Sequence, residues 1–108
     1  MNTEKAYELI AQLAIIKAGD LDWDTLIVEK EIYEKMSKST HWVLIGEKRL
    51  QGSGSPTFEL RDQESDATLF LRDNILETTS ERIWGLIFKL NKDGQFNIEY
   101  NYNKPEWI

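Results

Sequence analysis

The chain lacks cysteine altogether and has only one histidine and two prolines among its 108 residues. The absence of cysteine excludes disulfide bonds, thiolate metal sites and cysteine nucleophiles, and it is typical of cytosolic proteins. Long apolar runs are also missing, since Leu13–Ile16 is far shorter than the roughly 20 apolar residues of a membrane span. The N-terminus has no basic segment of the kind that opens a signal peptide. These absences predict a soluble, cytoplasmic protein without a membrane partner.

Acidic residues outnumber basic ones by 19 to 13, which gives the chain a net charge of −6. A surface of that sign repels phosphate backbones, so direct binding of nucleic acid is disfavoured. It attracts basic partners, although negative charge also simply keeps a small domain soluble. The hydrophobic fraction of 41% is enough for a modest core, and the length fits one domain over residues 1–108.

The N-terminal segment has the pattern of an amphipathic helix. Apolar residues recur at helical spacing over 3–18, where Asn2 or Thr3 can cap the start and Gly19 ends the run. The segment that follows, 19–24, reads GDLDWD and is expected to be a short acidic connector.

Two strand patterns come next. Residues 25–36 alternate between two faces as a strand does, although their Glu and Lys residues also suit a helix. The sequence SKS at 37–39 is predicted to turn the chain into a second strand over 40–50. Continuous apolar character at 42–45 predicts that this strand is buried on both faces or lies at the centre of the sheet.

The middle of the chain contains the clearest loop and a second helical pattern. Glycine, serine and proline dominate 51–56, and a short strand at 57–60 is a further expectation. Helical spacing begins at Asp62 and predicts a helix over about 62–77, with its first acids placed where a helix N-terminus favours negative charge.

The last two strand patterns, 84–90 and 96–102, allow a prediction of their register. A two-residue Asp-Gly loop would place the two apolar rows on opposite faces, which a one-sided core rejects. A three-residue loop at 92–94, with Gly94 in a left-handed conformation after a type I turn, places both rows on one face. The predicted pairs are Leu90 with Phe96, Phe88 with Ile98, Leu86 with Tyr100, and Trp84 with Tyr102.

The predicted order of elements is α-β-β-(β)-α-β-β, where the bracketed strand is the short one at 57–60. This order indicates an α+β fold in a single small domain. We expect a mainly antiparallel sheet with helices packed on it.

No group of residues in the sequence has the composition of a catalytic or metal site. His41 has no assignable partner on its predicted strand, so a structural role is favoured over catalysis. The acids of 20–24 lack the glycine that a calcium loop needs next, and 52–55 lacks the residues of a phosphate-binding loop. Glu29 and Glu31 share a strand face, but neighbouring lysines favour a solvated mixed-charge surface. We therefore predict neither catalytic residues nor a cofactor or metal.

The closing residues resemble a known family. The pattern W-x-L-x-F-x-L at 84–90, followed by DGQFNIEYNY at 93–102 and an end soon afterwards, resembles the YezG-like family of immunity proteins, or antitoxins. The resemblance implies a protein, not an enzyme, that binds and neutralises a cognate bacterial toxin. Such toxins are commonly nucleases delivered between bacteria, as in contact-dependent growth inhibition.

The resemblance names no contact residues, so candidates for partner binding come from charge. They are Asp20, Asp22, Trp23 and Asp24 in the connector, and Asp62, Glu64 and Asp66 in the second helical pattern. The alternative for the second group is a purely local role at a helix N-terminus, and for Trp23 it is burial in the core. An adaptor for another basic partner and a small carboxylate-based hydrolase are the alternative functions, and the oligomeric state is left open.

Overall fold

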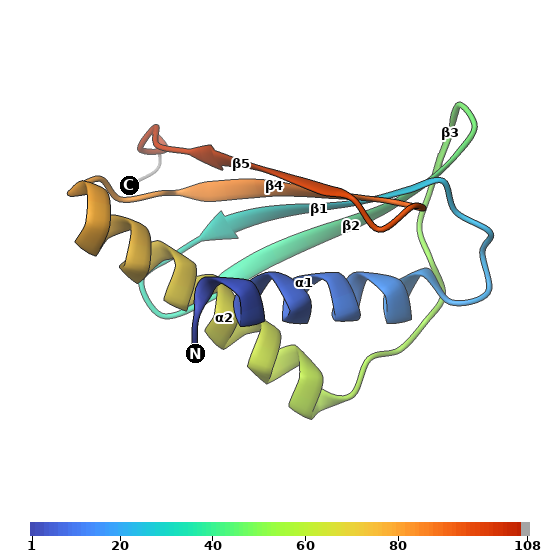
Figure 1. Ribbon diagram of the computed structural model, residues 1–108, viewed down its shortest axis with the longest axis horizontal. Helices are drawn as coiled ribbons and strands as arrows, with labels where there is room; N and C mark the ends of the chain where they lie inside the picture. The colour runs from blue at the N-terminus through green and yellow to red at the C-terminus, as the bar shows by residue number, and fades with distance from the viewer. Residues whose placement is uncertain (107–108) are drawn as a thin grey trace.

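The computed structural model describes residues 1–106, and these form two helices packed on one five-stranded sheet (Figure 1). The helices are α1 (Thr3–Ala18) and α2 (Phe58–Thr79), and the strands are β1 (Thr25–Ile32), β2 (Ser37–Ile45), β3 (Lys48–Leu50), β4 (Gly85–Asn91) and β5 (Phe96–Asn101). The strands lie in the order β3-β2-β1-β4-β5, and every neighbouring pair is antiparallel. The predicted α+β fold is therefore confirmed.

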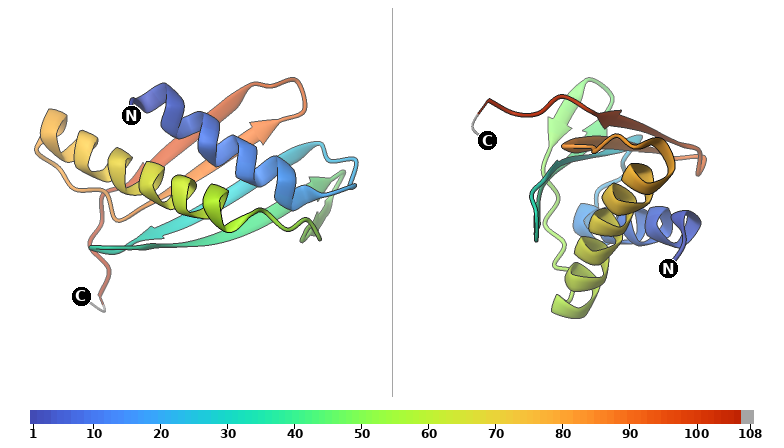
Figure 2. Two further views of the ribbon diagram at one scale, coloured as in Figure 1. Left: turned by 90° about the horizontal axis from the view of Figure 1, so that it is seen from below. Right: turned by 90° about the vertical axis from the view of Figure 1, so that its left-hand side faces the viewer.

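Both helices cover the same face of the sheet, and among residues 1–106 no helix covers the other face (Figure 2). Alternate residues of β1, from Leu26 to Ile32, face the helices, as the period of two in a strand requires. The core between the helices and the sheet includes Ala6, Ile10, Ala14, Leu26, Val28, Leu71, Leu86 and Phe88. One layer of helices over one sheet leaves two unlike surfaces, the outer side of the helices and the open side of the sheet.

Helix α1 has the bounds that its sequence pattern predicts. The side chain of Asn2 caps the start by accepting a hydrogen bond of 2.8 Å from the Lys5 N–H. Gly19 ends the helix with a φ of 64°, a conformation that few residues other than glycine adopt. Buried alanines along the inner side, Ala6 and Ala14 among them, allow close packing of the layers.

The turn between β1 and β2 lies four residues earlier than predicted. The Tyr33 N–H donates to the Met36 carbonyl over 2.8 Å, so the chain turns at 33–36 and the prediction of a turn at 37–39 is wrong. Serine often occurs in turns, but here Ser39 faces Lys30 across the β1–β2 pair on the inner side of the sheet.

The predicted strand at 57–60 is also wrong, because helix α2 already begins at Phe58. The Thr57 hydroxyl caps the helix by accepting from the Leu60 N–H at 3.1 Å. The third strand is instead β3, separated from β2 by a turn at Gly46. Since α2 starts before the predicted 62–77, its acids at 62–66 lie in the helix interior and not in the first turn.

The closing hairpin has the predicted register over β4 and β5. Leu90 pairs with Phe96, and the next two pairs follow as the alternation requires. The Gly94 N–H donates to the Asn91 carbonyl at 2.9 Å, and Gly94 has a φ of 90°, as expected for the three-residue loop. Only the predicted pair of Trp84 with Tyr102 falls outside the strands, since β4 begins at Gly85.

Candidate functional site

The outer side of helix α2 carries a row of acidic residues, which is interrupted for about two turns between Asp66 and Asp73. The row consists of Glu59, Asp62, Asp66, Asp73 and Glu77, and all five are exposed. Their spacings of three, four, seven and four residues place them within about 60° around the axis of a helix with 3.6 residues per turn. We call this row the acidic stripe. It lies opposite the buried side of the helix, which contains Ala67 and Leu71.

The acidic stripe accounts for much of the negative charge of the chain. Helix α2 has six acidic and two basic residues, so it contributes −4 of the net charge of −6. Within residues 1–106, Asp73 is the one stripe residue in an ion pair, which joins it to Arg72 at 2.9 Å. The other stripe carboxylates face solvent and are available to a basic partner.

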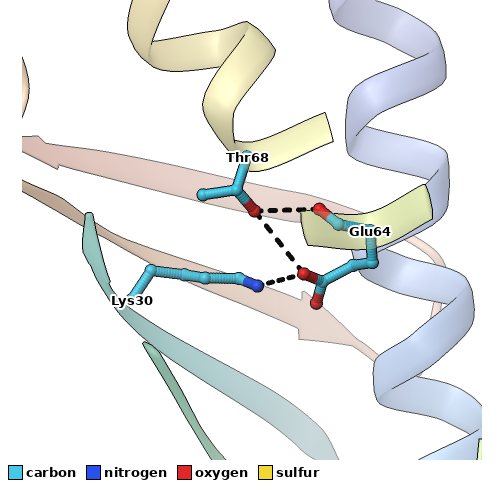
Figure 3. A network of polar contacts seen from close by, with 3 residues as sticks. All are labelled: Lys30, Glu64 and Thr68. Carbon is cyan, nitrogen blue, oxygen red and sulfur yellow. Dashed lines mark hydrogen bonds and ion pairs between the residues drawn. The ribbon is translucent and has the colours of Figure 1, made fainter. Parts of the chain in front are cut away.

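Glu64 does not belong to the stripe, although the sequence placed it with Asp62 and Asp66. It is only 3% exposed, and its carboxylate forms a buried ion pair with the Lys30 ammonium of β1 (Figure 3). The Thr68 hydroxyl, one turn further along α2, donates to the Glu64 backbone carbonyl at 3.0 Å and lies 3.5 Å from its carboxylate. The prediction of Glu64 as a surface contact is therefore wrong.

The Lys30–Glu64 pair joins the sheet to the helix layer. Burial lowers the pKa of the Lys30 ammonium below its ordinary value of 10.5, and the adjacent Glu64 carboxylate acts in the opposite direction. A buried charge without its partner is strongly unfavourable. The position of α2 over the sheet thus depends on this pair, and with it the orientation of the acidic stripe.

The connector residues have mixed roles. Asp20 and Asp22 are exposed, and Asp22 forms only a loose, exposed ion pair with Lys92 at 3.5 Å. Trp23 packs against the hydrophobic core, in agreement with the structural alternative for this residue. The Asp24 carboxylate accepts from the Gly46 N–H at 2.7 Å and so holds the turn between β2 and β3.

The two groups of candidate residues do not form one site. Within residues 1–106, no hydrogen bond or ion pair joins the connector acids to α2. Two exposed connector acids, Asp20 and Asp22, therefore remain as contact candidates beside the stripe. Sequence reasoning missed Glu59, Asp73 and Glu77, although their spacing from Asp62 and Asp66 contained the signal.

The open side of the sheet contains a shallow hollow of about 330 Å³, lined by Glu29, Glu31, Glu99 and Lys38. Gly85 forms part of its floor, and a Cβ there would meet the Lys30 carbonyl at 2.6 Å. A carboxylate hydrolase would be favoured by two close, buried carboxylates. Within the described part of the chain, Glu64 is the one buried carboxylate, and its partner is a lysine.

Comparison with protein-family models finds no match to this chain, and comparison with curated proteins finds none either. Neither helix of residues 1–106 is long and apolar enough to cross a membrane. In the same residues, no three histidine, aspartate or glutamate side chains come together in a group that could hold a metal ion.

Proposed function

We propose that this protein is a cytoplasmic immunity protein that binds a basic bacterial toxin, in the first instance a nuclease, through the acidic stripe of α2. The observation that carries the proposal is the stripe itself, with its five exposed acids on one side of one helix. The resemblance of 84–102 to YezG-like immunity proteins supports the same function on separate grounds.

Electrostatics explains why such a surface suits a nuclease partner. A nuclease presents basic side chains to the phosphates of its substrate, so a row of carboxylates can occupy the same surface. Charge complementarity also steers the two proteins together and raises the association rate. The acidic stripe would then exclude nucleic acid from the toxin without any catalytic group on this chain.

The roles of the segments differ in this proposal. The closing hairpin, which carries the family resemblance, is scaffold, since Leu86 and Phe88 are buried in the core. Recognition falls to α2, with Asp62 and Asp66 at the centre of its N-terminal half. Asp20 and Asp22 of the connector are secondary contact candidates.

The proposal is tested with the gene immediately upstream, which we expect to encode a large secreted protein with a variable C-terminal domain. That domain, produced alone, should inhibit bacterial growth, and co-expression of this chain should restore growth. The two proteins should also co-purify. Growth inhibition that persists despite well-expressed, folded chain would contradict the proposal.

An adaptor for another basic protein is the second candidate, because the acidic stripe alone does not distinguish the two functions. In that case the chain would bind a basic partner but would not restore growth in cells that express the toxin domain. The growth assay therefore separates the two functions, whereas co-purification does not.

A further inference from the structure

A separate polar cavity lies between the two helices and the inner side of β2. It has a volume of about 190 Å³ and opens among Lys17 of α1, Arg61 and Ser65 of α2, and Ser39 and His41 of β2. A single water occupies about 30 Å³ in the liquid, so the cavity has room for a polyatomic ligand. No residue of the acidic stripe lines it.

His41 forms part of the wall of this cavity. Both ring nitrogens are closed off from solvent, and neither has a hydrogen-bond partner within residues 1–106. Buried polar atoms of folded proteins are nearly always satisfied, and an apparent exception usually indicates an ordered water or ion. The ring is therefore a polar group in the wall of the cavity, and it senses charge that is placed there.

The charged side chains that line the cavity favour a negatively charged ligand. Lys17 and Arg61 form no ion pair with any described residue. Glu64 also lines the cavity, but its carboxylate is held by Lys30. Serine hydroxyls on β2 and α2 supply further donors. Positive charge and donors are thus concentrated at one point of a chain whose net charge is −6.

We propose that this cavity binds a small oxyanion of the phosphate type. The planar guanidinium of Arg61 matches two oxygens of such an anion, and the Lys17 ammonium supplies a second positive charge. The hydroxyls of Ser39 and Ser65, which line the same cavity, can donate to a third oxygen. This site is independent of toxin binding, so either proposal can fail without the other.

The protonation of His41 supports the same geometry. Burial lowers the pKa of His41 to about 4, and the positive charges of Lys17, Lys30 and Arg61 contribute to the shift. The other charged group that lines the cavity on this side, Glu64, is neutralised by Lys30. A bound anion would oppose these positive charges, so its binding is expected to raise the pKa of His41.

The test is a nuclear magnetic resonance titration of the imidazole with inorganic phosphate. Since His41 is the only histidine in the sequence, its ring signal needs no separation from others. At constant ionic strength, phosphate should shift the signal saturably and raise the pKa of His41. An equal, non-saturating shift with sodium chloride alone would overturn the proposal.

Variants establish whether the cavity is the site. Arg61→Gln removes one charge-assisted contact and should weaken phosphate binding about tenfold. Lys35→Gln, an exposed lysine of the β1–β2 turn that does not line the cavity, is the matched control and should leave the affinity unchanged. Both side chains are exposed, so the fold should survive, which circular dichroism checks. Equal affinities for phosphate in the two variants would contradict the assignment.

Adenosine monophosphate tests whether the cavity binds free phosphate or the phosphate group of a larger molecule. If it binds more tightly than phosphate, the cavity accepts phosphate groups of larger molecules. If only inorganic phosphate binds, the cavity holds a free anion, and both results support an oxyanion site. Failure of both ligands to shift the His41 signal would overturn it.

Discussion

The two sides of helix α2 both carry acidic residues, but those on the outer side are exposed and the one on the inner side is buried. On the outer side, Asp62 and Asp66 are exposed and have no ion-pair partner within residues 1–106. On the inner side, Glu64 is buried against Lys30 and holds the helix on the sheet. Each of these three acids lies only two residues from the next in sequence. The difference shows that the angular position of an acid on a helix, and not its clustering along the chain, decides whether it is exposed to solvent or buried in an ion pair.

The largest expected effect follows from removal of the inner acid. Glu64→Ala leaves the Lys30 charge buried without a partner, which should cost about 3–5 kcal/mol of unfolding free energy. Urea denaturation measures the loss. Asp66→Ala, two residues further along the outer side, is the matched control and should change stability by no more than about 0.5 kcal/mol. Similar losses in the two variants would remove the distinction between the sides.

Replacement of both partners of the buried ion pair tests whether the pair itself stabilises the fold. Glu64→Leu combined with Lys30→Met removes both charges and fills the space with apolar atoms. This double variant should be close to wild type in unfolding free energy, since a buried pair and a packed apolar pair differ little. A loss of unfolding free energy as large as that of Glu64→Ala would mean that the ion pair does more than compensate its two buried charges, and that it stabilises the fold itself.

A second inner group, His41, predicts that the stability of the fold depends on pH. The pKa of His41 is about 4 in the folded protein and 6.5 in an ordinary, solvated histidine. Above pH 6.5 the ring is neutral in both states, and its contribution to stability is complete. As the pH falls from 6.5 to about 4, only the unfolded chain takes up the proton, so stability is lost.

That loss should reach about 2 kcal/mol, after allowance for the partial exposure of the residue. It is measured by urea denaturation from pH 7 to pH 4 without phosphate or sulfate. In His41→Gln the position cannot titrate, so the difference between the two pH profiles isolates the ring from the carboxylates. Parallel profiles would show that His41 titrates normally in the fold.

The smallest effect is expected from the outer side. Asp62→Lys together with Asp66→Lys reverses two stripe charges but breaks no buried contact, so the unfolding free energy should change by less than about 1 kcal/mol. A thermal unfolding curve gives the comparison. A larger loss would indicate that the stripe also has a structural role.

Sequence patterns predicted the elements whose signals are local. The bounds of α1 followed from a cap, a helical apolar row and Gly19, and the register of the closing hairpin followed from a core on one side of the sheet. The start of α2 was missed because Phe58 was assigned to an apolar strand, whereas it is 85% exposed at the first turn of a helix. Local apolar character did not correspond to burial there.

The candidate site was predicted only in part, for a physical reason. Burial of Glu64 depends on Lys30, which lies 34 residues away in sequence and on another element. No local pattern contains that pairing. The acidic stripe, in contrast, could have been found by continuing the helical spacing from Asp62 in both directions. The charges of Asp62 and Asp66 were identified, but their extension along the helix was not.

The most direct test of recognition through the acidic stripe is the affinity of the upstream-encoded toxin domain for two charge-reversed variants. The stripe variant carries Asp62→Lys and Asp66→Lys, and the control carries Glu4→Lys and Glu8→Lys, two exposed acids at the same spacing on α1. Calorimetry at low salt should show affinity weakened at least about tenfold in the stripe variant and changed less than about twofold in the control. Equal affinities in the two variants would contradict recognition through α2.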